Sequence, residues 1–220
     1  MEKQVLVISE KDVQDIIGER HIDLNREIEK ALLITGQKKC ILPDKISQIF
    51  DGSVQTRINC MPATLLEEKV SGMKWVSVFP TNSKKGIKNV SGAVLLSEIR
   101  TGKLLCLCSA TVLTALRTAA VGAVAAKYLA PRKVDTIGFI GGGEEAKFHL
   151  IQIKKMFPQI RYCKIASRTS VSEKRFVEEM SACYPQITFL KCGSNFQNAV
   201  KGADIVVTAT SSQEQLLQTD

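Results

Sequence analysis

The sequence predicts an α/β protein in which an N-terminal α+β domain (residues 1–130) precedes a Rossmann parallel-sheet domain (residues 131–220). Three observations support this. Short β-leaning runs separated by turn residues fill residues 40–105. From Val134 on, β and α segments alternate, as in a parallel sheet with right-handed crossovers. A glycine run, Gly141 to Gly143, lies between an expected strand and an expected helix. The 220 residues, 45% of them hydrophobic and 24% charged, suit one large globular domain or two small ones.

The first domain should begin with a strand over Val5 to Ile8. Ser9 then precedes acidic residues as an N-cap, and a helix should run from there to about Ile17. A second amphipathic helix is expected over residues 21–33, where apolar residues recur at helical spacing. Antiparallel strands and hairpins fit residues 40–105 best.

A long apolar segment follows, from Ser109 to Ala130. It contains Arg117 and Lys127, and its alanine content suits a buried helix of a soluble protein better than a bilayer span. We therefore expect no membrane partner. Pro131 should end the helix, and the domain boundary is placed there.

The second domain should alternate strands and helices. The expected order is strand 134–140, helix 144–157, strand 162–166, helix 172–183, strand 187–190, helix 195–201 and strand 204–209.

Charge and cysteine usage exclude several functions. The net charge is +8, but the basic residues are spread along the chain, and only 5% of residues are aromatic, so nucleic-acid binding ranks last among the interpretations. The seven cysteines show no C-x-x-C spacing, which favours reduced thiols and a cytoplasmic protein. With only two histidines, no metal site is expected.

The glycine run matches the G-x-G-x-x-A pattern of a dinucleotide-binding turn. Gly141 would make the tight turn, Gly143 would let the backbone approach a pyrophosphate, and Ala146 would permit close helix packing. The helix that follows offers free N–H groups to the anion. Glu144 and Glu145 lie at this site too, and their carboxylates must point into solvent or merely complement the helix dipole.

The end of the second Rossmann strand distinguishes the cofactors. An NAD site usually has an acidic residue there, whereas this chain has Ser167, Arg168 and Thr169. Arg168 and the two hydroxyls can receive a 2′-phosphate, so NADP is favoured over NAD. A surface arginine in a loop is the alternative interpretation.

Three basic residues stand inside apolar runs of the first domain: Arg57, Lys74 and Arg117. A buried charge is costly unless it is paired, and a substrate carboxylate would pair with it. The alternative is that each side chain extends to solvent.

The same segments resemble a known family. The motifs, in order, are Met61-Pro62, Gly72-x-Lys74, Pro80-x-Asn82, Leu113-Thr-Ala-Leu-Arg-Thr-Ala-Ala120, Ala125-Ala-Lys-Tyr-Leu129 and Ile140-Gly-Gly-Gly-Glu-Glu-Ala146. Together they are similar to the ornithine cyclodeaminase/mu-crystallin family over residues 9–211.

This resemblance implies a homodimer whose first domain supplies the substrate site and the dimer surface, and whose Rossmann domain carries NAD or NADP. Members act at the α-carbon of an amino acid or reduce an imine, as cyclodeaminases, alanine dehydrogenases and ketimine reductases do. A non-catalytic, crystallin-like protein that binds a cofactor or small ligand is the alternative.

The resemblance also implies residue roles. Lys74 matches the catalytic lysine, Arg117 the carboxylate-binding arginine, and Thr118 lies near the cofactor phosphates. Arg57 is a candidate second carboxylate contact, with Lys45 as its alternative.

Three finer expectations follow from the resemblance. Gly72-x-Lys-Trp75 and residues 89–96 are most similar to the N-(2-amino-2-carboxyethyl)-glutamate dehydrogenase branch, which makes diaminopropionate for siderophores. Thr210 should lie at the cofactor. The family's catalytic aspartate and last Rossmann strands lie beyond the region that matches residues 208–210, so we expect an incomplete Rossmann domain.

Overall fold

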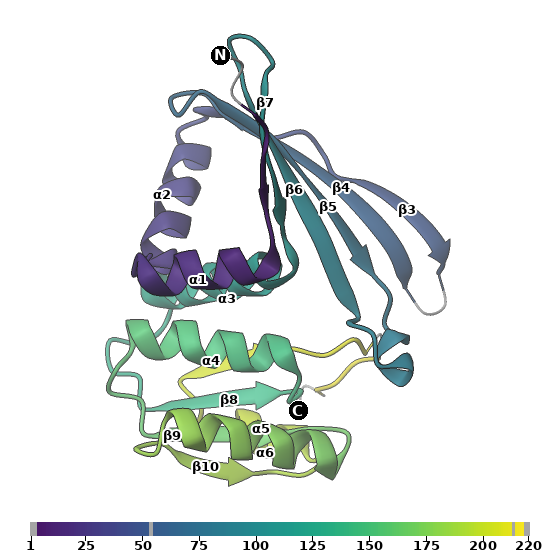
Figure 1. Ribbon diagram of the computed structural model, residues 1–220. Helices are drawn as coiled ribbons and strands as arrows, with labels where there is room; N and C mark the ends of the chain where they lie inside the picture. Colours follow the sequence, from purple (N-terminus) through teal and green to yellow (C-terminus); the bar gives the residue numbers. More distant parts are fainter. Residues whose placement is uncertain (1–3, 53–54, 213, 218–220) are drawn as a thin grey trace. The chain divides into compact units, whose positions relative to one another are not determined.

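The structure, a computed structural model, describes residues 4–52, 55–212 and 214–217. The chain forms two compact units, Met1–Thr114 and Ala115–Asp220, each built around its own sheet (Figure 1). This division falls inside a long helix, whereas the boundary expected from the sequence lies at that helix's C-terminal end. As a boundary between functions, residue 130 stays a prediction.

The first unit is a seven-stranded sheet of order β1-β7-β6-β5-β4-β2, with β3 also paired to β4. The expected hairpins are confirmed, since β2 to β7 pair antiparallel. The parallel pairing of β1 with β7 was not predicted, because these strands come from opposite ends of the sequence of this unit. The elements are β1 (Leu6–Ile8), α1 (Glu10–Glu19), α2 (Leu24–Gly36), β2 (Cys40–Ile41), β3 (Ile46–Asp51), β4 (Thr56–Leu65), β5 (Val70–Val78), the 3-10 helix η1 (Asn82–Lys85), β6 (Val90–Glu98) and β7 (Leu104–Ser109).

Side-chain caps fix where the two helices of this unit begin. Ser9 caps α1 as predicted: its hydroxyl accepts from the Asp12 N–H at 3.2 Å, and the Asp12 carboxylate accepts from the Ser9 N–H at 2.8 Å. Helix α2 begins at Leu24 instead of His21, because the Asp23 side chain caps it and His21 has a φ of +48°.

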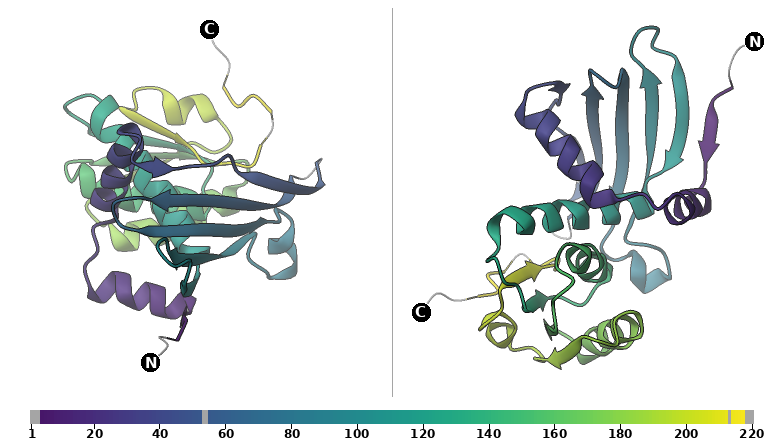
Figure 2. Two further views of the ribbon diagram at one scale, coloured as in Figure 1. Left: turned by 90° about the horizontal axis from the view of Figure 1, so that it is seen from above. Right: turned by 90° about the vertical axis from the view of Figure 1, so that its left-hand side faces the viewer.

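Helices α1 and α2 lie on one side of this sheet (Figure 1), and the right-hand view of Figure 2 looks at the strands from that side. Val13 of α1 packs there against the buried Cys106 and Cys108 of β7. We call this the helix face of the sheet; cross-strand partners of these cysteines share it.

The second unit contains a four-stranded parallel sheet of order β10-β9-β8-β11, which confirms the Rossmann prediction. The helix α3 (Thr111–Leu129) leads into it. Its other elements are β8 (Thr136–Ile140), α4 (Glu144–Met156), β9 (Tyr162–Ala166), α5 (Ser170–Cys183), β10 (Thr188–Lys191), α6 (Phe196–Val200) and β11 (Ile205–Thr208). Helix α5 begins two residues earlier than predicted because Thr169 caps it.

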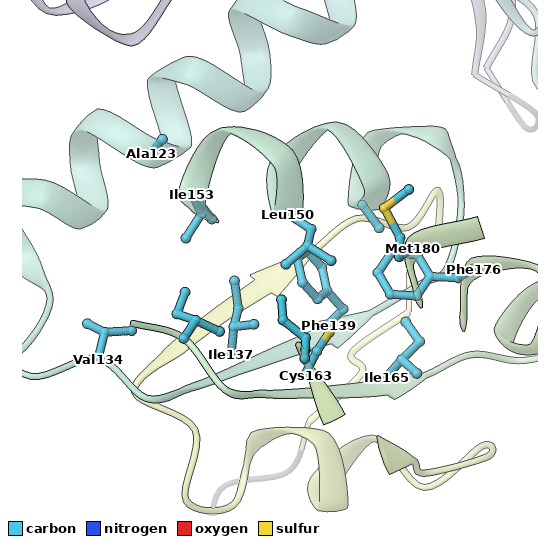
Figure 3. Close-up of a cluster of buried hydrophobic side chains, with 13 residues drawn as sticks. Ala123, Val134, Ile137, Phe139, Leu150, Ile153, Cys163, Ile165, Phe176 and Met180 are labelled. Carbon is cyan, nitrogen blue, oxygen red and sulfur yellow. The ribbon is translucent and has the colours of Figure 1, made fainter. Parts of the chain in front are cut away.

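The core of this unit is formed by fully buried side chains of β8, β9, α4 and α5 (Figure 3). The rings of Phe139 and Phe176 lie 5.5 Å apart, between centroids, and Leu150 and Ile165 are completely buried. Helix α6 packs directly on β8, since a Cβ on Gly138 would lie 2.1 Å from the Ala199 carbonyl oxygen. This packing of helices on the sheet holds the ends of its strands in place.

Helix α3 is long and apolar enough to cross a membrane by length and composition alone. The core helix of a soluble protein passes the same test. Ala119, Ala120 and Ala123 of α3 have no exposed surface, and Ala123 belongs to the Rossmann core, but only 28% of the most apolar part of the helix is buried in the single chain.

Candidate active site

The turn after β8 requires glycine at Gly141. Its φ is +100°, and a Cβ there would lie 2.3 Å from the Ala209 carbonyl oxygen at the end of β11. Its N–H donates to the Ala166 carbonyl at 2.8 Å, at the end of β9. Gly141 therefore lies where the carboxyl ends of three strands meet, as the predicted tight turn requires.

Gly143 has different surroundings. A Cβ on Gly142 would lie 2.9 Å from the Ser172 carbonyl oxygen, whereas a Cβ on Gly143 would meet no atom within 4 Å. Gly143 is also the N-cap of α4 and provides no side-chain cap, so the first N–H groups of the helix have no such partner. Open space in front of uncapped N–H groups fits a phosphate of a dinucleotide.

The position of this turn in the sheet agrees with that fit. Strand order reverses between β8 and β11, and in open parallel sheets ligands bind outside the strand ends at such a point. Thr210 lies beside this turn, since its Cβ is 3.5 Å from a Cβ built on Gly141; its contact with the cofactor stays a prediction. The Thr210 hydroxyl is exposed and accepts from the Ser212 N–H at 2.8 Å.

The two glutamates of the first α4 turn differ. The Glu144 carboxylate lies 2.7 Å from the Lys147 Nζ and 3.8 Å from an Arg175 guanidinium nitrogen, toward α5. Glu145 Oε2 lies 3.9 Å from His149 Nδ1. Ala146 is fully buried, as close helix packing predicts.

The tip of β9 is partly exposed. Ser167 is buried and its N–H donates to the Gly193 carbonyl at 2.8 Å, while the Thr169 hydroxyl caps α5. Arg168 is exposed and forms no ion pair with any described residue. Its guanidinium is therefore available to an anion at the tip of β9. This position fits both a contact with the 2′-phosphate of NADP and an ordinary surface arginine in a loop.

Arg117 and Thr118 lie on α3. The Nε of Arg117 is buried and has no hydrogen-bond partner among the described residues, although the residue as a whole is only half-buried. A buried donor without a partner is unfavourable, and a carboxylate is one of the groups that a guanidinium binds bidentately.

Contact between α3 and α4 indicates which end of the Rossmann unit these residues occupy. A Cβ on Gly122 would lie 2.9 Å from His149 Cδ2, so the helices touch there. Ala123 then shares a cluster with Val134 and Ile153, near the start of β8. The earlier part of α3, with Thr118, therefore lies toward the same end of the unit as the start of α4.

Lys74 and Arg57 lie on the helix face of the first sheet. In the strand register, Lys74 lies opposite Met61 of β4 and Val94 of β6, and Val94 lies opposite the buried Cys108 of β7. Lys74 is therefore on the same face as Cys108. Arg57 lies on the same face of β4, two and four residues from Asn59 and Met61, and one guanidinium nitrogen donates to the Gln55 carbonyl at 2.8 Å. Lys45, the alternative to Arg57, is exposed. Both predicted residues are half-buried.

Sequence reasoning missed the polar partners of the glycine turn. Lys147 is almost completely buried and binds both Glu144 and Glu179, and Arg175 binds Glu179. The i,i+3 spacing of Glu144 and Lys147 was a signal for part of this network. Glu179 and Arg175 come from another helix, so only the fold brings them here.

Comparison with known proteins agrees with this geometry. A model of the ornithine cyclodeaminase/mu-crystallin family matches residues 1–220. The ornithine cyclodeaminase of Agrobacterium fabrum is 35% identical over 176 residues, which cover 77% of this chain and 46% of that protein.

Two solved structures share the fold. Thermococcus litoralis Δ(1)-pyrroline-2-carboxylate reductase, in complex with NADH and L-proline, gives a TM-score of 0.89 at 29% identity, covering 97% of this chain and 64% of that one. An archaeal alanine dehydrogenase dimer with bound NAD gives 0.82 at 28% identity, covering 96% and 62%. The chain spans about half the length of the ornithine cyclodeaminase and less than two thirds of either structure.

Proposed function

Because the chain belongs to the ornithine cyclodeaminase/mu-crystallin family, we propose that it is part of an NAD(P)-dependent oxidoreductase acting at the α-carbon of an amino acid or of an amino-acid-derived imine. One observation carries the proposal: the uncapped α4 N-terminus faces open space at Gly143, at the reversal point of a parallel sheet. The NADH-bound reductase and the NAD-bound alanine dehydrogenase support it.

The second unit holds the dinucleotide in this proposal. N–H groups after Gly143 bind its phosphates, Thr118 and Thr210 lie beside them, and Ser167, Arg168 and Thr169 face its ribose. When bound, the nicotinamide accepts or donates a hydride, which no side chain can do.

The chain's own residues bind the substrate and move a proton. Arg117 binds the substrate carboxylate with its guanidinium fork, and Arg57 adds a second cation. Lys74 gives or takes a proton at the substrate nitrogen.

Cofactor binding is the first test. Titration of the wild-type chain with NADH and with NADPH, followed by nicotinamide fluorescence, should give saturable binding for at least one of them. A folded protein that binds neither would contradict the proposal.

Turnover tests the role of Lys74. With an amino acid that the wild type oxidises, Lys74→Ala should lose about 100-fold or more in kcat, because general acid-base catalysis contributes about that much. The exposed Lys84 provides the control, since Lys84→Ala removes the same charge from the 3-10 helix η1, outside the strands. Equal kcat values for the two variants would remove Lys74 from the mechanism.

Arg168 decides between the cofactors in this proposal. Its exposed guanidinium binds the 2′-phosphate of NADP, so Arg168→Ala should weaken NADPH binding about tenfold and leave NADH binding within about twofold. Fluorescence titration of both nucleotides measures this. Equal losses for both would assign Arg168 no part in choosing the cofactor.

For the substrate, we propose the branch that makes diaminopropionate, in a siderophore pathway. The residues around Trp75 support it. A panel of candidate amino acids, including N-(2-amino-2-carboxyethyl)-glutamate, tests it through NADH or NADPH formation; activity on ornithine, proline or alanine alone would contradict it. The free cysteines accord with a cytoplasmic enzyme, which is the compartment we propose.

A homodimer is also part of the proposal. The sheet side opposite the helix face is apolar: Ile46, Cys60 and Trp75 form one cross-strand row, and Met73, Leu95, Leu107 and Val7 another. Trp75, Leu107 and Val7 are 39%, 38% and 76% exposed in the single chain. A second copy would cover this surface.

A non-catalytic, crystallin-like binding protein is the second candidate. Two carboxylates in the first turn of α4 favour it because they depart from the usual pattern of a dinucleotide-using enzyme. Saturable dinucleotide binding without hydride transfer from any amino acid in the panel would support it over the enzyme.

A further inference from the structure

Helix α4 has an unfavourable composition for a helix that binds phosphate. Its first turn contains Glu144 and Glu145, so two negative charges lie at the end that should receive an anion. A carboxylate near an uncapped helix N-terminus also competes with a phosphate for the same N–H groups. Phosphate binding therefore requires that these carboxylates be held elsewhere.

A nearly buried lysine holds one of them. The Lys147 side chain is 6% exposed, whereas the Glu144 side chain is 65% exposed. The Lys147 Nζ donates to Glu144 Oε1 at 2.7 Å and also to a carboxylate oxygen of Glu179 on α5. One ammonium group thus ties the first turn of α4 to the neighbouring helix.

Arg175 completes the network. Its Nε donates to Glu179 Oε1 at 2.7 Å, and another guanidinium nitrogen lies 3.8 Å from Glu144 Oε1. The two acids and two bases of this network cancel in charge. Glu144 therefore contributes little net negative charge at the phosphate site, and its carboxylate is directed toward α5.

We propose that Lys147 is a positioning residue for the dinucleotide: it keeps the Glu144 carboxylate on α5 and so leaves the α4 N-terminus open to the phosphates. The inference rests on the proposed function and adds to it the means by which this chain accepts an anion beside Glu144. Lys147 itself does not touch the ligand in this account.

The test replaces Lys147 and then removes the charge that it holds. Lys147→Met keeps an apolar stem of similar length, and Glu179 keeps Arg175 as its partner, so the α4 and α5 packing should survive. NADH or NADPH, whichever binds the wild type better, should bind this variant about tenfold more weakly, and the loss should shrink in high salt.

Two further variants separate positioning from simple charge or packing. Lys155→Met removes the same charge from the exposed C-terminal end of α4 and should bind within about twofold of the wild type. Lys147→Met combined with Glu144→Gln should also bind within about twofold, because the displaced carboxylate is gone.

Each result has one meaning. Unchanged affinity in Lys147→Met, or a loss that Glu144→Gln does not restore, would overturn the inference while the proposed function stands. A lower melting temperature together with an unrestored loss would assign Lys147 a packing role only. Failure of the wild type to bind either nucleotide would remove the proposed function and this inference together.

Discussion

Gly141 and Gly143 lie two residues apart, yet an added methyl group meets different surroundings at each. At Gly141 it would have a φ of +100° and overlap the Ala209 carbonyl oxygen. Gly141→Ala should therefore lower the free energy of unfolding by about 3 kcal/mol, from backbone strain plus steric overlap. Urea unfolding measures this.

Gly193 is the matched control. Its φ is +62°, but no atom lies within 4 Å of a Cβ built there. Gly193→Ala should cost only the backbone strain, about 1 kcal/mol. Equal losses for the two variants would mean that the strand-end contact at Gly141 does not matter.

At this scale the sequence predicted the tight turn at Gly141 correctly, because that turn has a local cause, whereas the role of Gly143 at a phosphate stays a prediction. Arg168 was assigned correctly to the tip of β9, but local sequence cannot say whether a surface arginine has a ligand. Lys147 was missed since its partner Glu179 lies 32 residues away on another helix.

At the scale of elements, capping residues explain both the successes and the errors. Ser9 fixed the start of α1 as expected, whereas Asp23 and Thr169 shifted the starts of α2 and α5. Periodicity alone does not locate a cap. The parallel pairing of β1 with β7 depends on contacts that are distant in sequence, so no local pattern predicts it.

The network between α4 and α5 should make stability depend on pH. Hydrogen bonds from Lys147 first, and from Arg175, lower the pKa of Glu179 below its ordinary value of 4.5. A group with a lowered folded-state pKa stabilises the protein above the unfolded-state pKa, and this contribution is lost as the pH falls through the folded-state pKa.

The wild type should thus lose more thermal stability between about pH 5.5 and about pH 3 than Glu179→Gln does, by about 1 to 4 °C for a half-exposed group. Differential scanning fluorimetry across this range measures it. Glu178→Gln, on the same helix, should follow the wild type. A Glu179→Gln curve parallel to both would show that the network does not stabilise the fold.

For the whole molecule, composition and alternation were enough to predict an α+β unit before a Rossmann unit. They could not predict which face of the first sheet carries Lys74 and Arg57, because that depends on strand register. Register assigns both residues to the helix face and Trp75 to the opposite, apolar face.

The apolar face predicts the state of assembly. Light scattering should give about twice the 24.2 kDa mass of one chain for the wild type. Trp75→Glu would place a charge in the proposed interface and should yield monomers, whereas Ile87→Glu, at an exposed position outside the strands, should not. A Trp75→Glu dimer would place the interface elsewhere.

The central claim is that a dinucleotide occupies the open space at Gly143, and Gly143→Ala tests it most directly. Because no atom lies within 4 Å of the added Cβ, the free energy of unfolding should fall by no more than about 1 kcal/mol, the difference between glycine and alanine as an N-cap. The methyl group would nevertheless fill the phosphate site, so NADH or NADPH should bind at least about tenfold more weakly by calorimetric titration. Wild-type affinity in a stable Gly143→Ala protein would contradict the account.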